Sequence, residues 1–582
     1  LQMNKLKYVL PILLVGNILC MMDVSIMTIV IPEIQTAFSV SLSDLSWTVN
    51  VYTIVFAALI IPFGRLAERW GQHRIVFLGL MTFGFGSLMT GLAPNLAFML
   101  VARGIQSIGA AIIIPTSMVI ALDLSNADNR NKVVAALAGS QGLAVALGPA
   151  VGGFVAQYLD WRWVFYINLP FIIVLLVIYP FVLNIRRETR RAVKIDWLGA
   201  SLSCIFLTTL SLGLIKANDW GWTSLTIVTM FIASGLTFIL FIVQELHTPS
   251  PMINLSLFKN RNFTASGIAL LLSNYLLGGM VILIPTLLTK VQGETELNAA
   301  LLITPYFVSV MLTVIMTSLL IKRINQKILI GLSFIIIAGS YLLIAHLNLS
   351  QGYHRLIIAD ILLGIGYGLV AATANILVAS DFHGRALTDS QSVANILRQV
   401  GFIIAIALFT SVLSTNINTA KQNTITYAHQ QIQTLDIQQA LKNKMLTKVD
   451  QKLSPNDSQS NRANNNTMSI SVDTTKIKHQ ALDTAYQKQL QLAATQLHTN
   501  IDNIPEPVKH IIYQKVSNVA LPRIEQDIQQ TKNQLNTTIS HIKDHFIIES
   551  RQAFMSVYQV MIIVPILSLL LLFVFKKMQP KR

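Results

Sequence analysis

A few charged residues interrupt otherwise apolar segments of this chain, and their chemistry could serve proton transfer. Asp23 and Arg103 lie in the first and fourth of these segments, at a similar depth if each segment crosses a bilayer. A charged group inside a bilayer costs several kcal/mol unless it is paired or hydrated. A carboxylate binds a proton in a low-dielectric cavity and releases it beside an arginine. The pair is therefore predicted either to exchange a proton or to hold two helices together as a static ion pair.

A second pair, Asp360 and Arg398, lies in later apolar segments. Asp360 is close in sequence to Arg355, near the end of its segment, which favours a salt bridge at the membrane interface. Arg398 has a polar face of Gln391, Asn395 and Gln399 around it. It is predicted to line a cavity or to neutralise Asp360.

The polar residues within apolar segments define a predicted substrate cavity between helices. Its members are Asn50, Tyr52, Gln106, Asn274, Tyr275, Asn395, Arg398 and Gln399.

Several kinds of chemistry have no signature in the sequence. It contains no GxxxxGK[ST] phosphate-binding loop, no HExxH and no other clustered metal-ligand pattern. We therefore expect no enzyme activity, no metal and no cofactor. Cys20 and Cys204 both fall in apolar segments, which argues against a disulfide framework.

The stretch from Gly142 to Gly153 reads GLAVALGPAVGG. On a helix its small residues form one stripe, which lets another helix pack closely, and Pro149 predicts a kink. Gly142, Gly148, Pro149, Gly152 and Gly153 are the residues of interest. Taken alone, the stripe fits either of two roles: close packing against another helix, or a bend that takes part in the mechanism of the protein.

These residues must be positioned by membrane helices, because 53% of the chain is hydrophobic and only 12% is charged. Runs of about 20 apolar residues are long enough to cross a bilayer. Fourteen such runs lie near 7–31, 46–64, 75–93, 97–120, 133–156, 164–184, 197–216, 223–243, 264–289, 298–321, 327–347, 355–379, 390–414 and 554–575.

The net charge of +16 is explained by topology. Lys and Arg gather in alternate loops, as the positive-inside rule requires for cytoplasmic loops. This distribution predicts cytoplasmic termini and contact with anionic membrane lipids, and it argues against nucleic-acid binding.

An internal repeat relates two segments, each with a charged residue six positions before a glycine: Arg103 before Gly109, and Asp360 before Gly366. We therefore predict an all-α polytopic membrane protein with two six-helix bundles in parallel order, an arrangement that places a substrate site between the halves. The expected parts are a first bundle over 1–184, a linker and two inserted helices over 185–245, five helices of the second bundle over 246–414, and its last helix with the tail over 554–582.

Residues 415–553 differ in composition, being rich in Gln, Asn, Thr and Lys. Spaced apolar residues over Ile432–Val449, Ile477–Leu497 and Ile524–Ile547 favour amphipathic helices, and breaks are expected at Ser454–Thr467 and Pro505–Pro507. We predict a helical insertion outside the membrane, which serves an envelope partner or forms a partly disordered loop without a role in transport.

The combined motifs resemble the fourteen-helix drug:proton antiporter branch of the major facilitator superfamily. Residues 64–74 resemble that superfamily's loop signature, with Glu68 where an aspartate is usual. The resemblance implies a cytoplasmic latch of Gly64, Glu68, Arg69, Gly71 and Arg74. Residues 103–111 resemble the helix 4 motif for proton transfer, 142–153 the antiporter motif of helix 5, and 23–32, 161–170 and 196–199 further motifs of the branch.

The resemblance implies a major facilitator fold in the plasma membrane. Its activity would be export of amphipathic or lipophilic compounds by alternating access, driven by the proton gradient, with Asp23 and Arg103 coupling proton entry to export. Two alternatives are an exporter of a lipid or cell-envelope precursor, and a receptor or scaffold on a degenerate transporter core.

Overall fold

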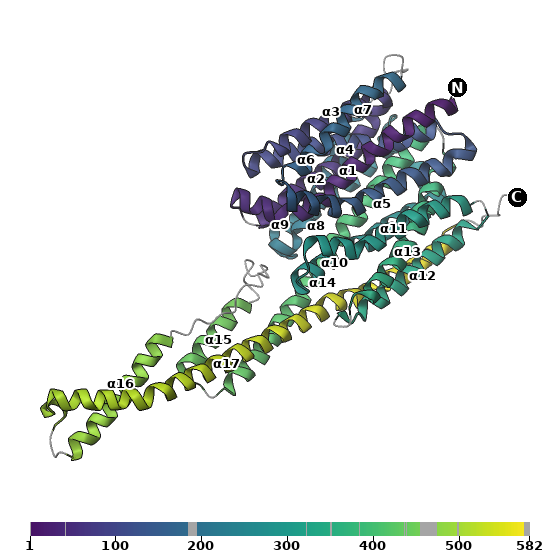
Figure 1. Cartoon of the computed structure of the whole chain (residues 1–582). Coiled ribbons are helices and arrows are strands. Elements are labelled where there is room, and N and C mark those ends of the chain that lie inside the picture. The colour runs from purple at the N-terminus through teal and green to yellow at the C-terminus, as the bar shows by residue number, and fades with distance from the viewer. Residues whose placement is uncertain are drawn as a thin grey trace. The chain divides into compact units, whose positions relative to one another are not determined.

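The fold is a bundle of long helices, taken here from a computed structural model of the chain (Figure 1). The structure describes residues 2–40, 42–183, 195–321, 323–349, 352–382, 385–435, 437, 439–453, 474–496 and 500–575. Over these residues every regular element is helical.

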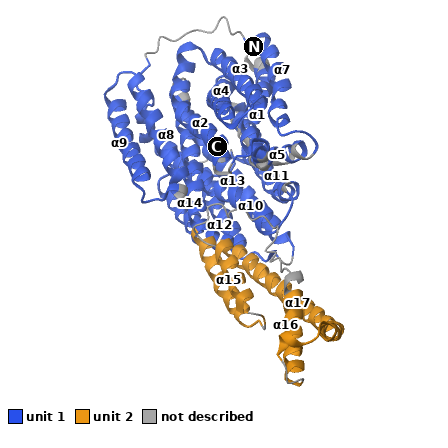
Figure 2. Cartoon of the chain, turned by 90° about the vertical axis from the view of Figure 1, so that its left-hand side faces the viewer, with its two compact units in different colours: residues 1–414, 554–582 blue, residues 415–553 orange. Residues whose placement is uncertain are grey.

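Two compact units make up the chain (Figure 2). Unit 1 comprises residues 1–414 and 554–582, and unit 2 comprises 415–553.

The first half of unit 1 contains the first six predicted crossings. Its helices are α1 (Gln2–Phe38), α2 (Leu42–Trp70), α3 (Gln72–Gly91), α4 (Leu96–Asp123), α5 (Ala127–Tyr158), α6 (Trp163–Tyr166) and α7 (Asn168–Val182). The Asn95 side chain caps α4 by accepting from the Phe98 amide at 2.9 Å, which sets where the helix carrying Arg103 begins.

The inserted pair consists of α8 (Trp197–Trp220) and α9 (Leu225–His247), which pack on each other, while α8 packs on α2. The second half follows with η2 (Leu255–Lys259), α10 (Arg261–Thr286), a π-helical turn η3 (Leu287–Val291), α11 (Glu296–Leu320), α12 (Gln326–Ala345), α13 (His354–Ser380) and α14 (Arg385–Gln433). It ends with α17 (Glu506–Met561), α18 (Ile563–Ser568) and η6 (Leu569–Phe573).

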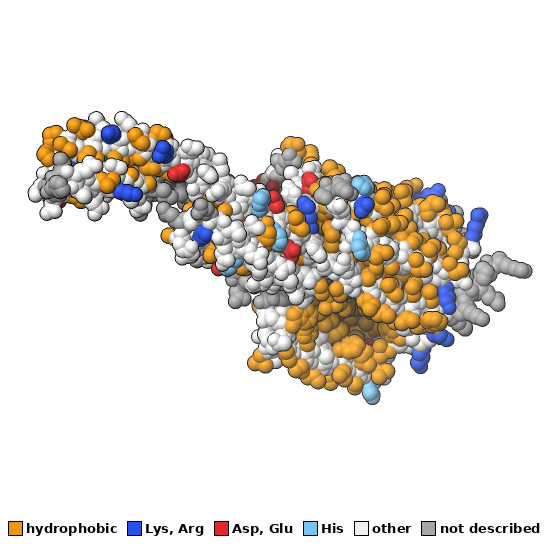
Figure 3. Space-filling view, turned by 90° about the horizontal axis from the view of Figure 1, so that it is seen from below, with side chains coloured by type: hydrophobic (Ala, Val, Ile, Leu, Met, Phe, Trp, Pro, Cys, Tyr) orange, Lys and Arg blue, Asp and Glu red, His pale blue; other side chains and the backbone are white. Residues whose placement is uncertain are grey.

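Thirteen helices of the described chain are long and apolar enough to cross a membrane. The remaining predicted crossing, 133–156, lies within the 32-residue helix α5. Hydrophobic side chains cover most of the face of unit 1 seen in Figure 3, and this apolar face is hollowed. The prediction of an all-α polytopic membrane fold is confirmed.

The internal repeat is visible in the way two glycines pack. A Cβ on Gly109 of α4 would lie 2.5 Å from the Phe83 amide nitrogen and 2.6 Å from the Gly79 carbonyl oxygen of α3. A Cβ on Gly366 of α13 would lie 3.0 Å from the Ser333 carbonyl oxygen and 3.2 Å from the Ile337 amide nitrogen of α12. Each glycine thus meets the backbone of the preceding crossing at two positions one turn apart. Arg103 and Asp360 therefore occupy equivalent places in the two halves.

Gly109→Ala is expected to lower the stability of the protein, because backbone atoms cannot move aside for the new methyl group. The expected cost is about 1–3 kcal/mol, read as a lower unfolding midpoint of purified protein in detergent. Gly104→Ala is the matched control on the same helix, since its Cβ would meet only Val51 Cγ1, at 3.7 Å. Equal unfolding midpoints for the two variants would contradict the packing described.

Unit 2 is helical and has two small cores. Its helices are the later part of α14, α15 (Gln439–Leu453), α16 (Thr474–Gln496), η5 (Ile501–Asn503) and most of α17. One core gathers Ala428, Ile432, Met445, Val449, Leu453, Leu535 and Ile542, and the other gathers Leu490, Ala494 and Ile504.

Two of the helix boundaries in this region differ from the sequence prediction. Residue 414 is not a helix end, since α14 continues to Gln433, and α15 begins only at Gln439. Pro522 lies inside α17, which begins between Pro505 and Pro507 as predicted. The break predicted at Ser454–Thr467 lies outside the described residues.

Candidate functional site

Asp23, Arg103 and Gln106 form a closed hydrogen-bonded network between α1 and α4. Arg103 Nη1 donates to Asp23 Oδ2 and, at 2.9 Å, to Gln106 Oε1. Gln106 Nε2 donates to Asp23 Oδ1 at 2.8 Å. Arg103 and Gln106 reach one carboxylate because residues three apart share a helix face. The three side chains are at most 1% exposed.

Residues of α2 and α6 surround the guanidinium. Arg103 Nε donates to the Thr48 carbonyl oxygen at 3.2 Å, and its Cζ lies 4.5 Å from the centroid of the Tyr52 ring and 5.9 Å from that of Phe165. Tyr52 is fixed in turn, because its hydroxyl donates to the Cys20 carbonyl oxygen at 3.2 Å. Cation–π contacts of this kind stabilise a desolvated cation. The arginine therefore keeps partial support when its carboxylate partner changes charge.

This arrangement makes Asp23 a place where a proton has a large structural effect. Breaking a buried ion pair by neutralising one partner costs about 3–5 kcal/mol, because the other charge remains buried. If Asp23 lost its charge, the contacts of Arg103 that remain unchanged among the described residues are those to the Thr48 carbonyl, the Gln106 amide oxygen and the aromatic rings.

Helix α5, which carries the Gly142–Gly153 motif, packs against α1 in the first half and α11 in the second. A Cβ on Gly148 would clash with Ser25 Oγ, and it would lie 3.2 Å from the Ile26 amide nitrogen. Gly148 therefore lets α5 approach α1 two residues from Asp23. Gly152 is buried, and the Cβ position of Gly153 is 3.7 Å from the Leu297 side chain of α11. The side-chain surroundings of Gly142 and Pro149 lie outside the described residues.

The predicted cavity residues divide between the two halves. Tyr52 and Gln106 belong to the Asp23 network, and Asn50 lies half-buried nearby on α2. In the second half, Asn274 Oδ1 accepts from the Tyr367 hydroxyl at 3.3 Å, and Arg398 donates to Asn375 Oδ1.

The other three members have different surroundings. Asn395 is buried and donates to the Gln391 carbonyl oxygen at 2.9 Å, while Gln399 is half-buried. Tyr275 belongs elsewhere, because its hydroxyl donates to Met561 Sδ at 3.0 Å and its ring packs on Phe409.

The predicted interfacial salt bridge of Asp360 with Arg355 is wrong. Asp360 is 0% exposed, whereas Arg355 is exposed. Five residues of helix rotation place the two side chains about 140° apart around α13. Arg398 does not neutralise Asp360 either, since its partner Asn375 lies 15 residues further along the sequence, about 22 Å along the helix axis.

A second charged site, centred on Arg65 of α2, ties the two halves together at one end of unit 1, which we call the Arg65 end. Arg65 pairs with Glu68 at 2.7 Å and with Asp389 of α14 at 3.0 Å. It also donates to the carbonyl oxygens of Pro251 at 2.6 Å and Met252 at 2.7 Å. Both carboxylates and the guanidinium are buried, so these are strong charge-assisted bonds.

The inserted helices hold the turn that Arg65 binds. The Ile253 amide donates to Glu245 Oε2 of α9 at 2.9 Å. Gln244, beside it on α9, donates to Asp196 Oδ2 at 3.0 Å, and Asp196 caps α8 through the Gly199 amide. The inserted pair thus fixes the carbonyl groups that Arg65 uses.

Arg130 makes a second tie between the halves at the same end. Its Nη2 donates to the carbonyl oxygens of Ala379 at 2.7 Å and Phe382 at 3.0 Å, where α13 ends. Unit 1 is therefore closed at the Arg65 end in this conformation.

The latch predicted from the sequence is placed here only in part. Glu68 binds Arg65, and a Cβ on Gly64 would lie 2.9 Å from Ser392 Oγ, so both lie against the second half. Gly71 forms the turn between α2 and α3 with φ 103°, and Arg74 lies half-buried on α3. Arg69 is exposed.

Sequence reasoning did not single out Arg65, Asp389 or Arg130 as functional. Arg65 is part of the loop signature in residues 64–74, which is the only signal that pointed to it. Its partners come from segments far away in the chain, and nothing in a single sequence pairs them.

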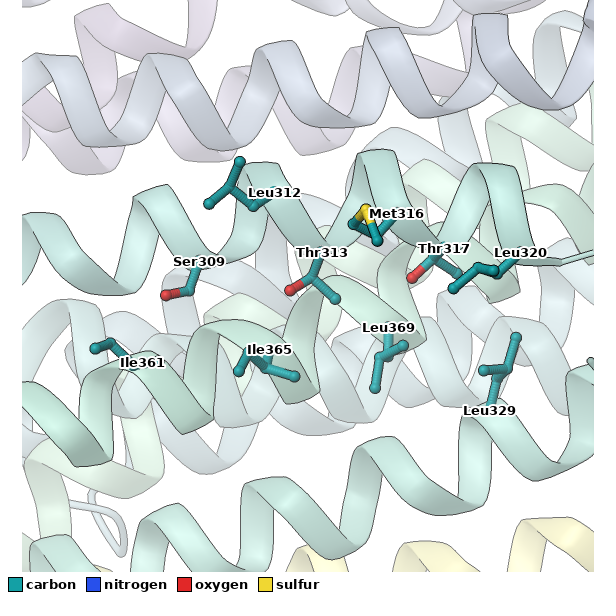
Figure 4. A pocket seen from close by; sticks show the side chains of 10 residues that line it. All are labelled: Ser309, Leu312, Thr313, Met316, Thr317, Leu320, Leu329, Ile361, Ile365 and Leu369. Carbon is teal, nitrogen blue, oxygen red and sulfur yellow. The ribbon is translucent and has the colours of Figure 1, made fainter.

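The second half also carries a groove of about 370 Å³ between α11, α12 and α13 (Figure 4). Its lining residues are Ser309, Leu312, Thr313, Met316, Thr317, Leu320, Leu329, Ile361, Ile365 and Leu369, none of them charged. The groove is apolar and separate from both charged sites. Within the described chain no group of His, Cys, Asp and Glu is suited to hold a metal ion.

Comparison with known proteins finds similarity to bacterial transporters and multidrug resistance proteins. The chain is 27% identical to the multidrug transporter protein MdtP of Bacillus subtilis over 376 residues, which are 64% of this chain and 69% of that protein. It is 28% identical to the probable multidrug resistance protein EmrY of Escherichia coli, over 55% of this chain and 63% of that protein. It is 26% identical to the riboflavin transporter RibZ of Clostridioides difficile, over 69% of this chain and 87% of that protein.

These relatives are transporters, not enzymes. The family model of the Major Facilitator Superfamily matches residues 13–406, which include the Asp23 network, the glycine motif of α5 and the charged site centred on Arg65. With its helical membrane fold, the chain belongs to the major facilitator superfamily.

Proposed function

We propose that this protein is a proton-coupled exporter of amphipathic or lipophilic compounds, of the multidrug efflux type, that works as an antiporter by alternating access. The buried network of Asp23, Arg103 and Gln106 carries the proposal, because a carboxylate paired with an arginine inside a bilayer is a natural proton exchanger. The names of relatives such as MdtP and EmrY support the substrate class.

The proposed orientation puts the Arg65 end and both termini in the cytoplasm and residues 415–553 outside the plasma membrane. Basic residues near that end, among them Arg69, Arg74, Arg323 and Lys327, support this orientation under the positive-inside rule. The conformation described is then closed toward the cytoplasm by Arg65 and Arg130.

In the proposed cycle a proton from outside reaches Asp23 while the cytoplasmic end is closed. Neutralising Asp23 weakens its bond to Arg103, which favours rearrangement of α1 against α4 and opening toward the cytoplasm. Release of the proton there restores the ion pair while substrate is bound. The protein needs no cofactor in this scheme, since the proton gradient supplies the free energy.

The test is transport into everted membrane vesicles with an imposed pH gradient. Lipophilic cationic dyes, neutral amphipathic dyes and riboflavin form a suitable first panel. We expect uptake of at least one compound that rises with the gradient and stops when a proton ionophore collapses it. Uptake that ignores the ionophore would refute proton coupling. A phospholipid or glycolipid retained in native mass spectrometry, with no dye transport, would favour export of an envelope precursor instead.

Removal of residues 418–550 is expected to spare dye transport. The two cut ends lie side by side within unit 2, because Asn416 Nδ2 donates to the Ala553 carbonyl oxygen at 3.1 Å, so a short Gly-Ser linker can join them. Among the described residues, the Asp23 network and the charged site centred on Arg65 contain no residue of unit 2. Transport within about twofold of the full chain is expected. Loss of transport in a folded deletion variant would show that unit 2 handles substrate.

A further inference from the structure

Asp360 is a buried carboxyl group for which the proposed cycle has no role so far. It lies on α13 with 0% exposure, and in the described part of the chain neither of its oxygens has a hydrogen-bond partner or an ion-pair partner. An isolated carboxylate ion in an apolar interior costs far more than a neutral acid. The protonated form is therefore the one that this conformation holds.

The side chains placed near Asp360 in the described part of the chain are tyrosines. Tyr306 of α11 and Tyr558 of α17 are in electrostatic range of its carboxyl group. Tyr341 of α12 stacks edge to face with Tyr558 at 5.1 Å, and Tyr275 of α10 lies near Tyr341.

These hydroxyl groups are only partly used. The hydroxyl of Tyr341 donates to the Leu276 carbonyl oxygen at 2.7 Å, and that of Tyr558 donates to the Gly279 carbonyl oxygen at 3.1 Å. The Tyr306 hydroxyl is buried and, among the residues that the structure describes, has no partner. The Tyr306 backbone lies against Gly364, one turn from Asp360, and the Tyr306 hydroxyl is in electrostatic range of the Asp360 carboxyl group.

Four described basic residues of the helices around α13 lie away from Asp360 or bind other groups. Arg130 of α5 binds carbonyl groups at the far end of α13, and Arg398 of α14 binds Asn375. Lys327 begins α12 at the Arg65 end, while Arg355 on α13 itself is exposed.

Equivalent positions of the two halves thus neutralise a buried carboxylate in different ways. In the first half the position is Arg103, whose guanidinium neutralises Asp23. In the second half the equivalent position is Asp360, which is itself the acid. A bound proton, and not a neighbouring positive charge, would neutralise it. Asp360 is six residues from the first residue of α13, at the end of the bundle opposite the Arg65 end, so its proton would come from that side.

We propose that Asp360 is a second proton-binding site, occupied while the Arg65 end is closed and emptied when that end opens. This inference rests on the proposed antiport, and it sets the number of protons exchanged per substrate to one more than Asp23 alone provides. Because Asp360 belongs to the second half and Asp23 to the first, each half of the transporter carries one proton.

Infrared difference spectroscopy of the protein in lipid bilayers tests this directly. We expect the carbonyl stretching band of a protonated carboxylic acid at neutral pH, lost at alkaline pH and lost when a transported dye is added from the Arg65 side. The band should be absent in Asp360→Asn, retained in Asp23→Asn and shifted in frequency in Asp360→Glu. Asp360→Glu keeps a carboxyl group at this position. If Asp360→Asn does not fold, the frequency shift in Asp360→Glu and the pH titration of the wild-type band still test the proposal.

Two results would overturn the proposal. One is a difference spectrum in which Asp360→Asn equals the wild type at every pH. The other is a band that neither pH nor dye changes, which would make Asp360 a permanently neutral packing group.

Counting protons separates this inference from the antiport itself. In proteoliposomes, Asp360→Asn should lower the proton-to-substrate ratio by one. If the wild type exchanges dye for protons and Asp360→Asn has the same proton-to-substrate ratio as the wild type, only the Asp360 proposal fails. If the wild type moves no protons while the infrared band still titrates, the antiport fails and the protonation site stands.

Discussion

Asp23→Asn is expected to reduce pH-gradient-driven uptake of dye to the background of vesicles that lack the protein. Asparagine keeps the size of the side chain and can still accept from Arg103, but it cannot gain or lose a proton. The variant should therefore retain exchange of dye down its own concentration gradient while losing accumulation driven by protons. Everted vesicles with and without a pH gradient measure the two activities side by side.

The matched control is Asp160→Asn in the same half. Asp160 is exposed and pairs with Arg162 at 3.4 Å, a contact of small energetic value at a surface. Its uptake should equal that of the wild type. Gradient-driven accumulation by Asp23→Asn at the wild-type rate would remove Asp23 from the coupling mechanism and leave it as a structural ion-pair partner.

Arg65→Ala is expected to open the Arg65 end of unit 1. The variant loses a buried ion pair with Asp389 and two bonds to backbone carbonyls, and we estimate the loss for the closed state at about 3 kcal/mol. This corresponds to a shift of about a hundredfold toward the open state. A cysteine at Ser392, which faces Gly64 in the closed state, reports the change through its rate of labelling by a water-soluble thiol reagent. Cys20 and Cys204 are first replaced by alanine.

Arg69→Ala provides the comparison, since Arg69 lies one turn along the same helix but is exposed. Its labelling rate at position 392 should match the parent protein. Equal rates for Arg65→Ala and Arg69→Ala would mean that the bonds of Arg65 do not hold the closed conformation.

The fold was predictable from the sequence because apolar runs of membrane length are a strong physical signal. The repeat was also visible, since Arg103 and Asp360 stand at the same distance from a glycine and those glycines pack alike. The pairing of Asp23 with Arg103 followed from depth alone, because few charges are buried in the membrane and opposite charges at one depth attract.

Other parts of the site could not be predicted, for reasons of geometry. Asp360 was assigned to an interfacial salt bridge because it is near Arg355 in sequence, but helix rotation separates the two side chains. Arg65 takes its partners from α14 and from the turn at 251–252, and such contacts depend on how the halves pack together. Helix α14 was predicted to end near 414, since hydropathy detects where apolar residues stop and not where a helix stops.

The turn that Arg65 binds offers main-chain oxygens, not side chains, as acceptors. This changes which mutations can remove the contacts of Arg65. A carbonyl group survives any amino acid replacement, so no single codon change can delete an acceptor at Pro251 or Met252. The bond to Asp389, by contrast, is lost through a change in either of two codons. A bond from Arg65 to the backbone therefore depends on one codon, whereas its bond to Asp389 depends on two. Position 251 is accordingly freer to vary in sequence than positions 65 and 389.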